Sequence, residues 1–399
     1  MVPSAVQIRS LTLVADGDGY VVGSPHTAEY VEVPELGAKI IAWLQEGLDV
    51  AECERRAADV AGEPVDVADF LTVLDGEGLF APPGTLPETD GPDLAGSFRQ
   101  RAGRLLFHPA AWVAYALVGL AAPVLLLAVP HLRPNYQDGF PFSTQLLNIL
   151  VLSVLGVLAA LAHEGAHVLA TAVHGLRSRL SVTRRLYFVT FQADLTRLWS
   201  LPRRARYAPL LAGITWDVVI LSVALLLQAG FAEQLGPVVV RLLRALVLMQ
   251  VTAVVAQALV FMRTDVYALL VNATGCKTLW ATKGALLRRY LRRATPDDER
   301  QLAGADPREV TWARRYLWLY LPGITIALVY LFTFALPSLR FLIELCVAPI
   351  RADGLTTPAA WAGLAALAIA VVPSLLALAG AARSGYRVVL TALRRRRSA

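Results

Sequence analysis

The chain has 399 residues, of which 56% are hydrophobic, and several stretches exceed the roughly 18 apolar residues that a membrane-spanning helix needs. This composition is too apolar for an ordinary soluble protein. The three cysteines, Cys53, Cys276 and Cys346, lie far apart and form no Cys-x-x-Cys pair, so we expect neither a disulfide framework nor a cysteine zinc site. The first residues, MVPSAVQIRS, lack the basic start and apolar core of a signal peptide.

The net charge of +6 hides two regions of opposite charge. Residues 1–90 hold 4 Lys and Arg against 17 Asp and Glu, whereas the remainder holds 33 against 14. Such a division predicts two domains with different surroundings. Because APPGTLPETDGPDLAGS is rich in proline, glycine and polar residues, we expect a soluble domain at 1–82, a linker at 83–105 and a membrane domain at 106–399.

The acidic region predicts a small α+β domain of the winged-helix type. The segments QIRSLTLV, GYVVGSP and EYVEV have strand composition, and turn residues separate them. Three helices follow in PELGAKIIAWLQEG, DVAECERRAADVAG and VDVADFLTVLDGEGLF, and Gly47 can end the first of them. A winged helix often binds DNA, but a charge of −13 repels phosphate, so we expect no nucleic-acid partner.

The order of these segments resembles the PqqD-like recognition domains of ribosomally made peptide natural products. The resemblance rests on GYVV followed by EYVEV, on the Leu-rich helix ending in EG, and on FLTVLDGEGLF. It implies that the leader of a precursor peptide adds as a strand to a sheet edge, here Glu29, Tyr30, Val31, Glu32 and Val33. The alternative is a cytoplasmic domain that only regulates or stabilises the protein.

The basic region predicts a multi-span α-helical membrane protein with about six transmembrane helices. We expect spans at 110–130, 146–174, 208–229, 240–262, 316–337 and 358–380. Lys and Arg gather before the first span, after the second and fourth, and in the final RRRR. The positive-inside rule therefore predicts a protein of the cell membrane with both termini in the cytoplasm, and the bilayer is one expected partner.

Within the second span the sequence reads HEGAH, with His163, Glu164 and His167. On a helix the two histidines, four residues apart, project from one face and can bind one zinc ion. Zinc lowers the pKa of a water that it binds, and the adjacent glutamate can accept and return the proton during peptide hydrolysis. The alternative is a set of buried polar residues paired with neighbouring helices, but ionisable groups in hydrocarbon usually mark function.

A hydrolytic zinc site needs a third protein ligand. His174 shares the face of His163, but it lies roughly 10 Å beyond His167 along the helix axis, which is too far without a bend. Asp265 is a better candidate because it sits at the cytoplasmic end of the fourth span, at a depth that matches His163.

HEGAH in a membrane helix, followed by an aspartate at a later helix end, resembles the site-2 protease class of intramembrane zinc metalloproteases. The resemblance covers about 145–275 and implies one Zn²⁺ held by His163, His167 and Asp265, with Glu164 as general acid and base. The chain departs from the family's Leu-Asp-Gly, which here reads TDVY, and from its GPxxN, which here reads GITWD. Asp217 in GITWD could orient substrate or a ligand, or compete with Asp265 as third ligand.

Between the second and third spans, RLYFVTFQADLTRLW alternates aromatic and branched residues. This pattern fits a β-hairpin near the site whose edge holds a substrate strand, and a simple interfacial segment is the alternative.

Together these features predict a membrane zinc metalloendopeptidase with its site near the cytoplasmic side, which removes the leader from a modified precursor peptide. Two other functions stay open. One is a site-2-type protease that cuts a membrane-anchored regulator such as an anti-sigma factor. The other is a non-enzymatic membrane protein that binds a peptide or gives immunity to it.

Overall fold

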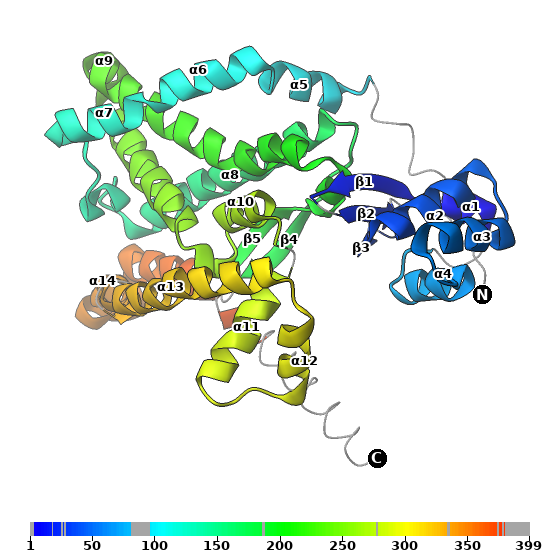
Figure 1. Cartoon of the computed structure of the whole chain (residues 1–399). Helices are drawn as coiled ribbons and strands as arrows, with labels where there is room; N and C mark the ends of the chain where they lie inside the picture. The colour runs from blue at the N-terminus through cyan, green and yellow to red at the C-terminus, as the bar shows by residue number, and fades with distance from the viewer. Residues whose placement is uncertain are drawn as a thin grey trace.

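The computed structural model describes residues 4–17, 19–24, 27, 29–80, 96–185, 188–276, 278–332, 336–372, 375–376 and 379. The described chain is mostly helical, with one three-stranded sheet near the N-terminus and one two-stranded hairpin (Figure 1). The N-terminal sheet and its helices lie to one side, drawn in blue, and the long helices form the other part of the molecule.

The N-terminal domain packs short helices against an antiparallel sheet of order β1-β2-β3. Its elements are α1 (Ala5–Arg9), β1 (Thr12–Asp16), β2 (Gly19–Ser24), β3 (Glu29–Val33), α2 (Glu35–Glu46), α3 (Val50–Ala61) and α4 (Val67–Gly76). One apolar core joins the sheet to the helices and includes Val22, Ile41, Cys53 and Leu71, each at most 2% exposed. The predicted α+β domain is therefore present.

Local signals explain where these helices begin and end. Asp49 and Asp66 cap α3 and α4 by accepting backbone N–H groups, and Gly47 ends α2 in the left-handed conformation that glycine tolerates best. The prediction of a strand over QIRSLTLV was wrong in its first half, because Ala5–Arg9 is a helix. Ser4 and Gln7 exchange hydrogen bonds between side chain and backbone there, a capping arrangement that favours the helix over the strand composition.

The remainder of the described chain contains one β-hairpin among helices. Its α-helices are α5 (Phe98–Leu106), α6 (Pro109–Gly119), α7 (Ala121–Ala128), α8 (Gln145–Ala172), α9 (Arg203–Gln257), α10 (Asp265–Thr274), α11 (Leu279–Tyr290), α12 (Pro296–Gly304), α13 (Pro307–Tyr330) and α14 (Leu336–Asp353). Its 3₁₀ helices are η1 (Pro130–Leu132), η2 (Tyr136–Gly139), η3 (Thr196–Ser200), η4 (Val260–Met262) and η6 (Gly354–Thr356). The hairpin pairs β4 (Leu180–Arg185) with β5 (Phe188–Ala193).

Three described helical stretches are long and apolar enough to cross a membrane: Pro109–Ala128, Gln145–Ala172 and Arg203–Gln257. The third is α9, whose backbone leaves the helical conformation at Phe231 and Gly236, just before Pro237. Its two parts contain the predicted third span and most of the predicted fourth, which extended beyond Gln257 to residue 262. Within the described residues the predicted fifth and sixth spans do not reach the same criterion, and Pro358–Val372 is a shorter apolar helix. These findings fit a membrane protein.

The predicted linker contains structure at its C-terminal end. Residues 81–95 lie outside the described part, but α5 occupies Phe98–Leu106 and packs against α8. Gly103 makes this approach close, because a Cβ there would lie 2.3 Å from the carbonyl oxygen of Leu169. The segment just before the first apolar helix is thus fixed to the helix that carries HEGAH.

Candidate metal centre

Three helices build the site, and each contributes residues at a defined place. His163 and His167 lie one turn apart on α8, and their rings are 5.0 Å apart between centroids. Asp265 is the first residue of α10, where the helix dipole stabilises the negative charge of an acidic side chain. Arg263, two residues earlier, has a left-handed backbone with φ 57°, and this sharp turn lets α10 start at the level of the histidines.

Three ligand atoms converge between these helices. Oδ2 of Asp265 lies 3.0 Å from Nε2 of His163 and 3.3 Å from Nε2 of His167, and the two Nε2 atoms are 3.3 Å apart. His163, His167 and Asp265 form a group of side chains that could hold a metal ion. The aspartate and histidines that the sequence predicted are therefore brought together.

The outer nitrogen of each imidazole faces an acceptor. Nδ1 of His167 lies 2.7 Å from the carbonyl oxygen of Pro209, and Nδ1 of His163 lies 2.8 Å from Oδ2 of Asp217. A carbonyl oxygen can only accept, so Nδ1 of His167 carries the proton, and the carboxylate favours the same tautomer in His163. Both Nε2 lone pairs then face each other and a carboxylate oxygen, an arrangement that a cation stabilises.

Gly213 of α9 lies directly against both imidazoles. A Cβ at this position would lie 2.4 Å from Nε2 of His167 and 2.5 Å from Nε2 of His163. The glycine therefore borders the space on which the ligand atoms converge, and any side chain would fill it. The donor set of two imidazole nitrogens and one carboxylate oxygen is one that divalent metal ions, zinc among them, accept.

Asp217 lies on the outer side of His163, away from the converging atoms. Asp217 is 3% exposed, and the side-chain nitrogen of Gln250 lies 3.3 Å from the Oδ1 atom of Asp217. Between the two aspartates that the sequence left as rivals, this geometry favours Asp265 as the third ligand. Asp217 instead holds the imidazole that would bind the metal, a contact that metal-binding histidines commonly make.

Gln257 is a site residue that the sequence prediction missed. Its side-chain oxygen accepts the backbone N–H of Asp265 at 3.1 Å, and its side-chain nitrogen lies 3.3 Å from Oδ2 of the same aspartate. The carbonyl of Gln257 also accepts the hydroxyl of Thr264 at 2.8 Å. The end of α9 thereby holds the start of α10 in place.

Glu164 contacts the β-hairpin. Its Oε2 accepts the backbone N–H of Ala193, the last residue of β5, at 2.7 Å. A β-hairpin is present, although only its second strand, β5, lies within the predicted segment RLYFVTFQADLTRLW, and β5 packs against α8. The Glu164 carboxylate therefore lies at the end of a strand, and in the helix Glu164 directly follows His163. His174 lies beyond the end of α8 and is exposed, outside this group.

The five residues of the predicted peptide-binding strand form β3, at one end of the sheet order. Tyr30 packs across Gly23 of β2, where a Cβ would lie 2.3 Å from the tyrosine ring. Burial raises the pKa of the Tyr30 hydroxyl, while nearby Arg197 and a hydrogen bond with Ser200 lower it. This side chain therefore lies against η3, the segment that follows the hairpin.

In comparisons with known proteins, no family model, curated protein or solved structure matches this chain.

Proposed function

We propose that this protein is an intramembrane zinc metalloendopeptidase that removes the leader from a ribosomally made, modified precursor peptide. The observation that carries the proposal is the convergence of His163, His167 and Asp265 beside Glu164. In this proposal the chain crosses the cell membrane six times, with both termini in the cytoplasm. The resemblances to site-2 proteases and to PqqD-like domains support the two halves of the proposal separately.

Each residue of the site has a role in peptide hydrolysis. Zinc bound by the two imidazoles and the Asp265 carboxylate would supply a Lewis acid that polarises a peptide carbonyl and acidifies water. Glu164 then accepts the proton of the attacking water and gives it to the leaving amine. Asp217 and the carbonyl of Pro209 keep both Nδ1 atoms protonated, so that both Nε2 atoms remain available as ligands.

The substrate is a peptide held in extended form. A protease must expose the scissile bond, and pairing with a strand edge keeps a segment extended through main-chain hydrogen bonds. The backbone N–H of Ala193 at the end of β5 donates to Glu164, and this contact between a strand and the carboxylate supports the proposal. The leader would add to β3, and the acidic N-terminal domain suits a leader with basic residues.

Co-expression of the full chain with each small peptide encoded beside its gene tests this function. Peptide masses are compared between the wild type, Glu164→Ala and Glu233→Ala, which changes an exposed glutamate near the bend in α9. We expect a shortened peptide with the wild type and Glu233→Ala, and the intact peptide with Glu164→Ala. Cleavage that persists in Glu164→Ala would overturn the catalytic assignment.

The other outcomes separate the alternative functions. A peptide that co-purifies intact with every variant would favour a binding or immunity protein. If no peptide is cut or bound, while a membrane-anchored regulator is cleaved only when Glu164 is present, the protein is a protease with a different substrate.

A further inference from the structure

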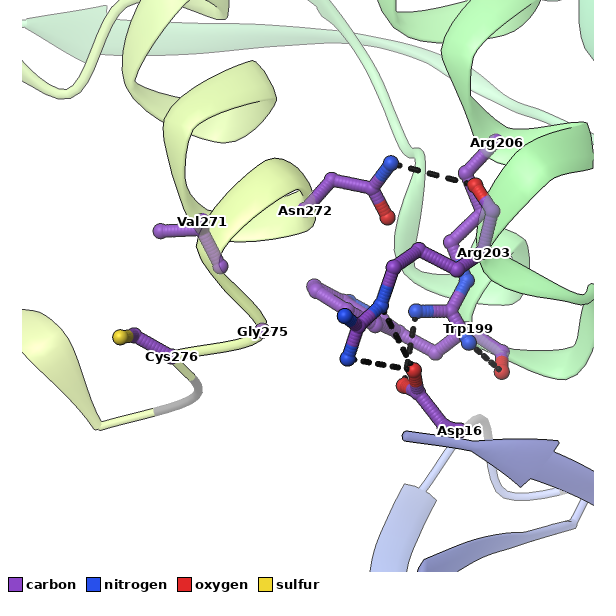
Figure 2. A pocket seen from close by; sticks show the side chains of 8 residues that line it. All are labelled: Asp16, Trp199, Arg203, Arg206, Val271, Asn272, Gly275 and Cys276. Carbon is purple, nitrogen blue, oxygen red and sulfur yellow. Dashed lines mark hydrogen bonds and ion pairs between the residues drawn. The ribbon is translucent and has the colours of Figure 1, made fainter. Parts of the chain in front are cut away.

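A buried carboxylate joins the N-terminal domain to the helix that supports the metal centre. Asp16 is the last residue of β1, and its side chain is 1% exposed. Its Oδ1 accepts from Nη2 and Nε of Arg203 at 2.9 and 3.0 Å, and its Oδ2 accepts from Nη1 of Arg206 at 2.9 Å. Figure 2 shows both arginine side chains, from the start of α9, pointing at this one carboxylate.

Each nitrogen of the Arg206 guanidinium donates a hydrogen bond. Its Nε donates to the carbonyl of Leu201 at 2.8 Å and its Nη2 to that of Trp199 at 3.2 Å, and it lies 4.7 Å from the centre of the Trp199 ring. The Arg206 side chain is 2% exposed. Removal of one partner from a buried ion pair leaves an unpaired buried charge, which is strongly destabilising. The docked arrangement of the N-terminal domain and α9 therefore requires Asp16.

From this ion pair, α9 runs directly to the metal centre. Arg206 is followed after one turn by Pro209, whose carbonyl holds His167. Gly213, one turn further, borders both Nε2 atoms, and Asp217 holds His163. Since residues four apart share one face of a helix, the supports of both histidines form a single row on α9. A shift at the start of the helix therefore moves this row.

A second helix makes the same connection from the other side. The side-chain nitrogen of Asn272 donates to the carbonyl of Arg203 at 3.2 Å, and a Cβ on Gly275 would lie 2.5 Å from Nη2 of Arg203 (Figure 2). Both residues lie at the C-terminal end of α10, whose first residue is Asp265. Ten helical residues span about 15 Å, so α10 links the arginine to the third ligand.

We propose that docking of the N-terminal domain through Asp16 and metal binding by His163, His167 and Asp265 are energetically coupled. The docked domain fixes Arg203 and Arg206, and these hold α9 and α10 in the positions that bring the three ligands together. Coupling between two sites is reciprocal, so a bound metal also tightens the docking. The inference rests on the proposed function only in treating the three residues as a metal site.

Through this coupling, the N-terminal domain regulates metal binding and hence the proposed reaction. β1 and β2 lie against η3, and Tyr30 of β3 interacts with Ser200 at its end. A peptide that binds the β3 edge and alters this contact therefore also alters the support of the metal ligands.

Metal titrations of the full chain in lipid nanodiscs test the coupling without any peptide substrate. Zn²⁺ affinity is measured by competition with a chromophoric chelator for the wild type, Asp16→Asn and Glu35→Gln. The control removes the same charge from the same domain, where exposed Glu35 pairs with Lys39 four residues further along α2. We expect Asp16→Asn to bind Zn²⁺ about fivefold or more weakly, and Glu35→Gln to bind it like the wild type.

Arg203→Gln separates coupling from simple electrostatics. Loss of a positive charge near the site would strengthen cation binding if charge alone decided the affinity, whereas loss of Asp16 would weaken it. The proposed coupling weakens Zn²⁺ binding in both variants, because both loosen the docking. Stronger binding by Arg203→Gln, or equal binding by Asp16→Asn and the wild type, would overturn the proposal.

Hydrogen exchange measures the reverse effect, that of Zn²⁺ binding on the N-terminal domain. Zn²⁺ should slow amide exchange in the segment 12–24 of the wild type, and this protection should be lost in Asp16→Asn. The same experiment shows whether each variant retains the protected amides of α8 and hence its fold. Zn²⁺ binding without any protection of 12–24 would contradict the coupling, whereas a wild type that binds no Zn²⁺ would contradict the proposed metal site itself.

Discussion

Nδ1 of His163 lies 2.8 Å from Oδ2 of Asp217, an aspartate 54 residues further along the chain. The other carboxylate oxygen of Asp217 lies 3.3 Å from the side-chain nitrogen of Gln250. Two donors from different parts of the structure thus meet one carboxylate. This relationship fixes which nitrogen of His163 is free for a metal, and it makes the charge state of Asp217 important as well as its shape.

Asp217→Asn should weaken metal binding although the side chain keeps its size. An asparagine has one oxygen and one NH₂ group, so in either orientation a donor would face the donor of His163 or of Gln250. We expect a loss of Zn²⁺ affinity of about tenfold to a hundredfold, measured by chelator competition. Asp297→Asn, which changes an exposed aspartate of α12, is the control, and equal affinities for the two variants would refute the role of Asp217.

Gly213→Ala should abolish metal binding while the helix remains. The new methyl group would lie 2.4 to 2.5 Å from the two Nε2 atoms, so the rings must move out of the converging arrangement. Gly165→Ala is a matched control between the histidines on α8, because a Cβ there meets nothing within 4 Å. Absorption of bound Co²⁺ reports the site directly. A normal Co²⁺ spectrum in Gly213→Ala would show that the metal binds elsewhere.

The surroundings of Lys283, a residue outside the metal site, predict that the stability of the protein depends on pH. Its ammonium group lies 3.7 Å from the ring centres of both Trp280 and Tyr320. Burial, with the nearby charges of Arg288 and Arg263, lowers the pKa of Lys283 to about 8. An unfolded lysine keeps its proton up to about pH 10.4, so between about pH 8 and pH 10 the unfolded chain binds more protons and stability rises with pH.

Lys283→Met should remove this rise in stability. Thermal unfolding of the detergent-solubilised chain is followed at about pH 7.5 and about pH 9.5 for the wild type, Lys283→Met and Lys39→Met, where Lys39 is half-exposed on α2. We expect the midpoint of Lys283→Met to gain less with pH than those of the other two proteins. Parallel gains in all three would show that Lys283 does not titrate in this range.

The local part of the site could be predicted from the sequence, because its spacing fixes its geometry. His163 and His167 share a helix face at any tertiary arrangement, and Glu164 must lie beside them. Asp265 was predicted as the third ligand from its expected depth and from the resemblance to site-2 proteases, with Asp217 left as a rival. The hairpin was also predictable, although β4 begins at Leu180, before the aromatic segment that suggested it.

The supports of the ligands depend on how the helices rotate about their axes, which the apolar pattern of a membrane helix does not specify. For this reason the sequence alone did not decide whether Asp217 is the third ligand or a residue that orients substrate or a ligand. One signal was present in PLLAGITWD, where Pro209, Gly213 and Asp217 recur every four residues and so share a face. Gln257 gave no such signal, since its contact with Asp265 depends on the turn between α9 and α10.

Gln257→Ala therefore tests a contact that only the structure reveals. The variant removes both the acceptor of the Asp265 backbone N–H and the donor near its Oδ2. The third ligand loses its orientation, and we expect Zn²⁺ affinity to fall by about tenfold. The control is Gln228→Ala, since Gln228 lies in the same helix but bonds to the carbonyl of Ala224 within that helix. If Zn²⁺ affinity falls equally in both variants, the effect comes from a general loosening of α9. That result would contradict the role of Gln257 in holding Asp265.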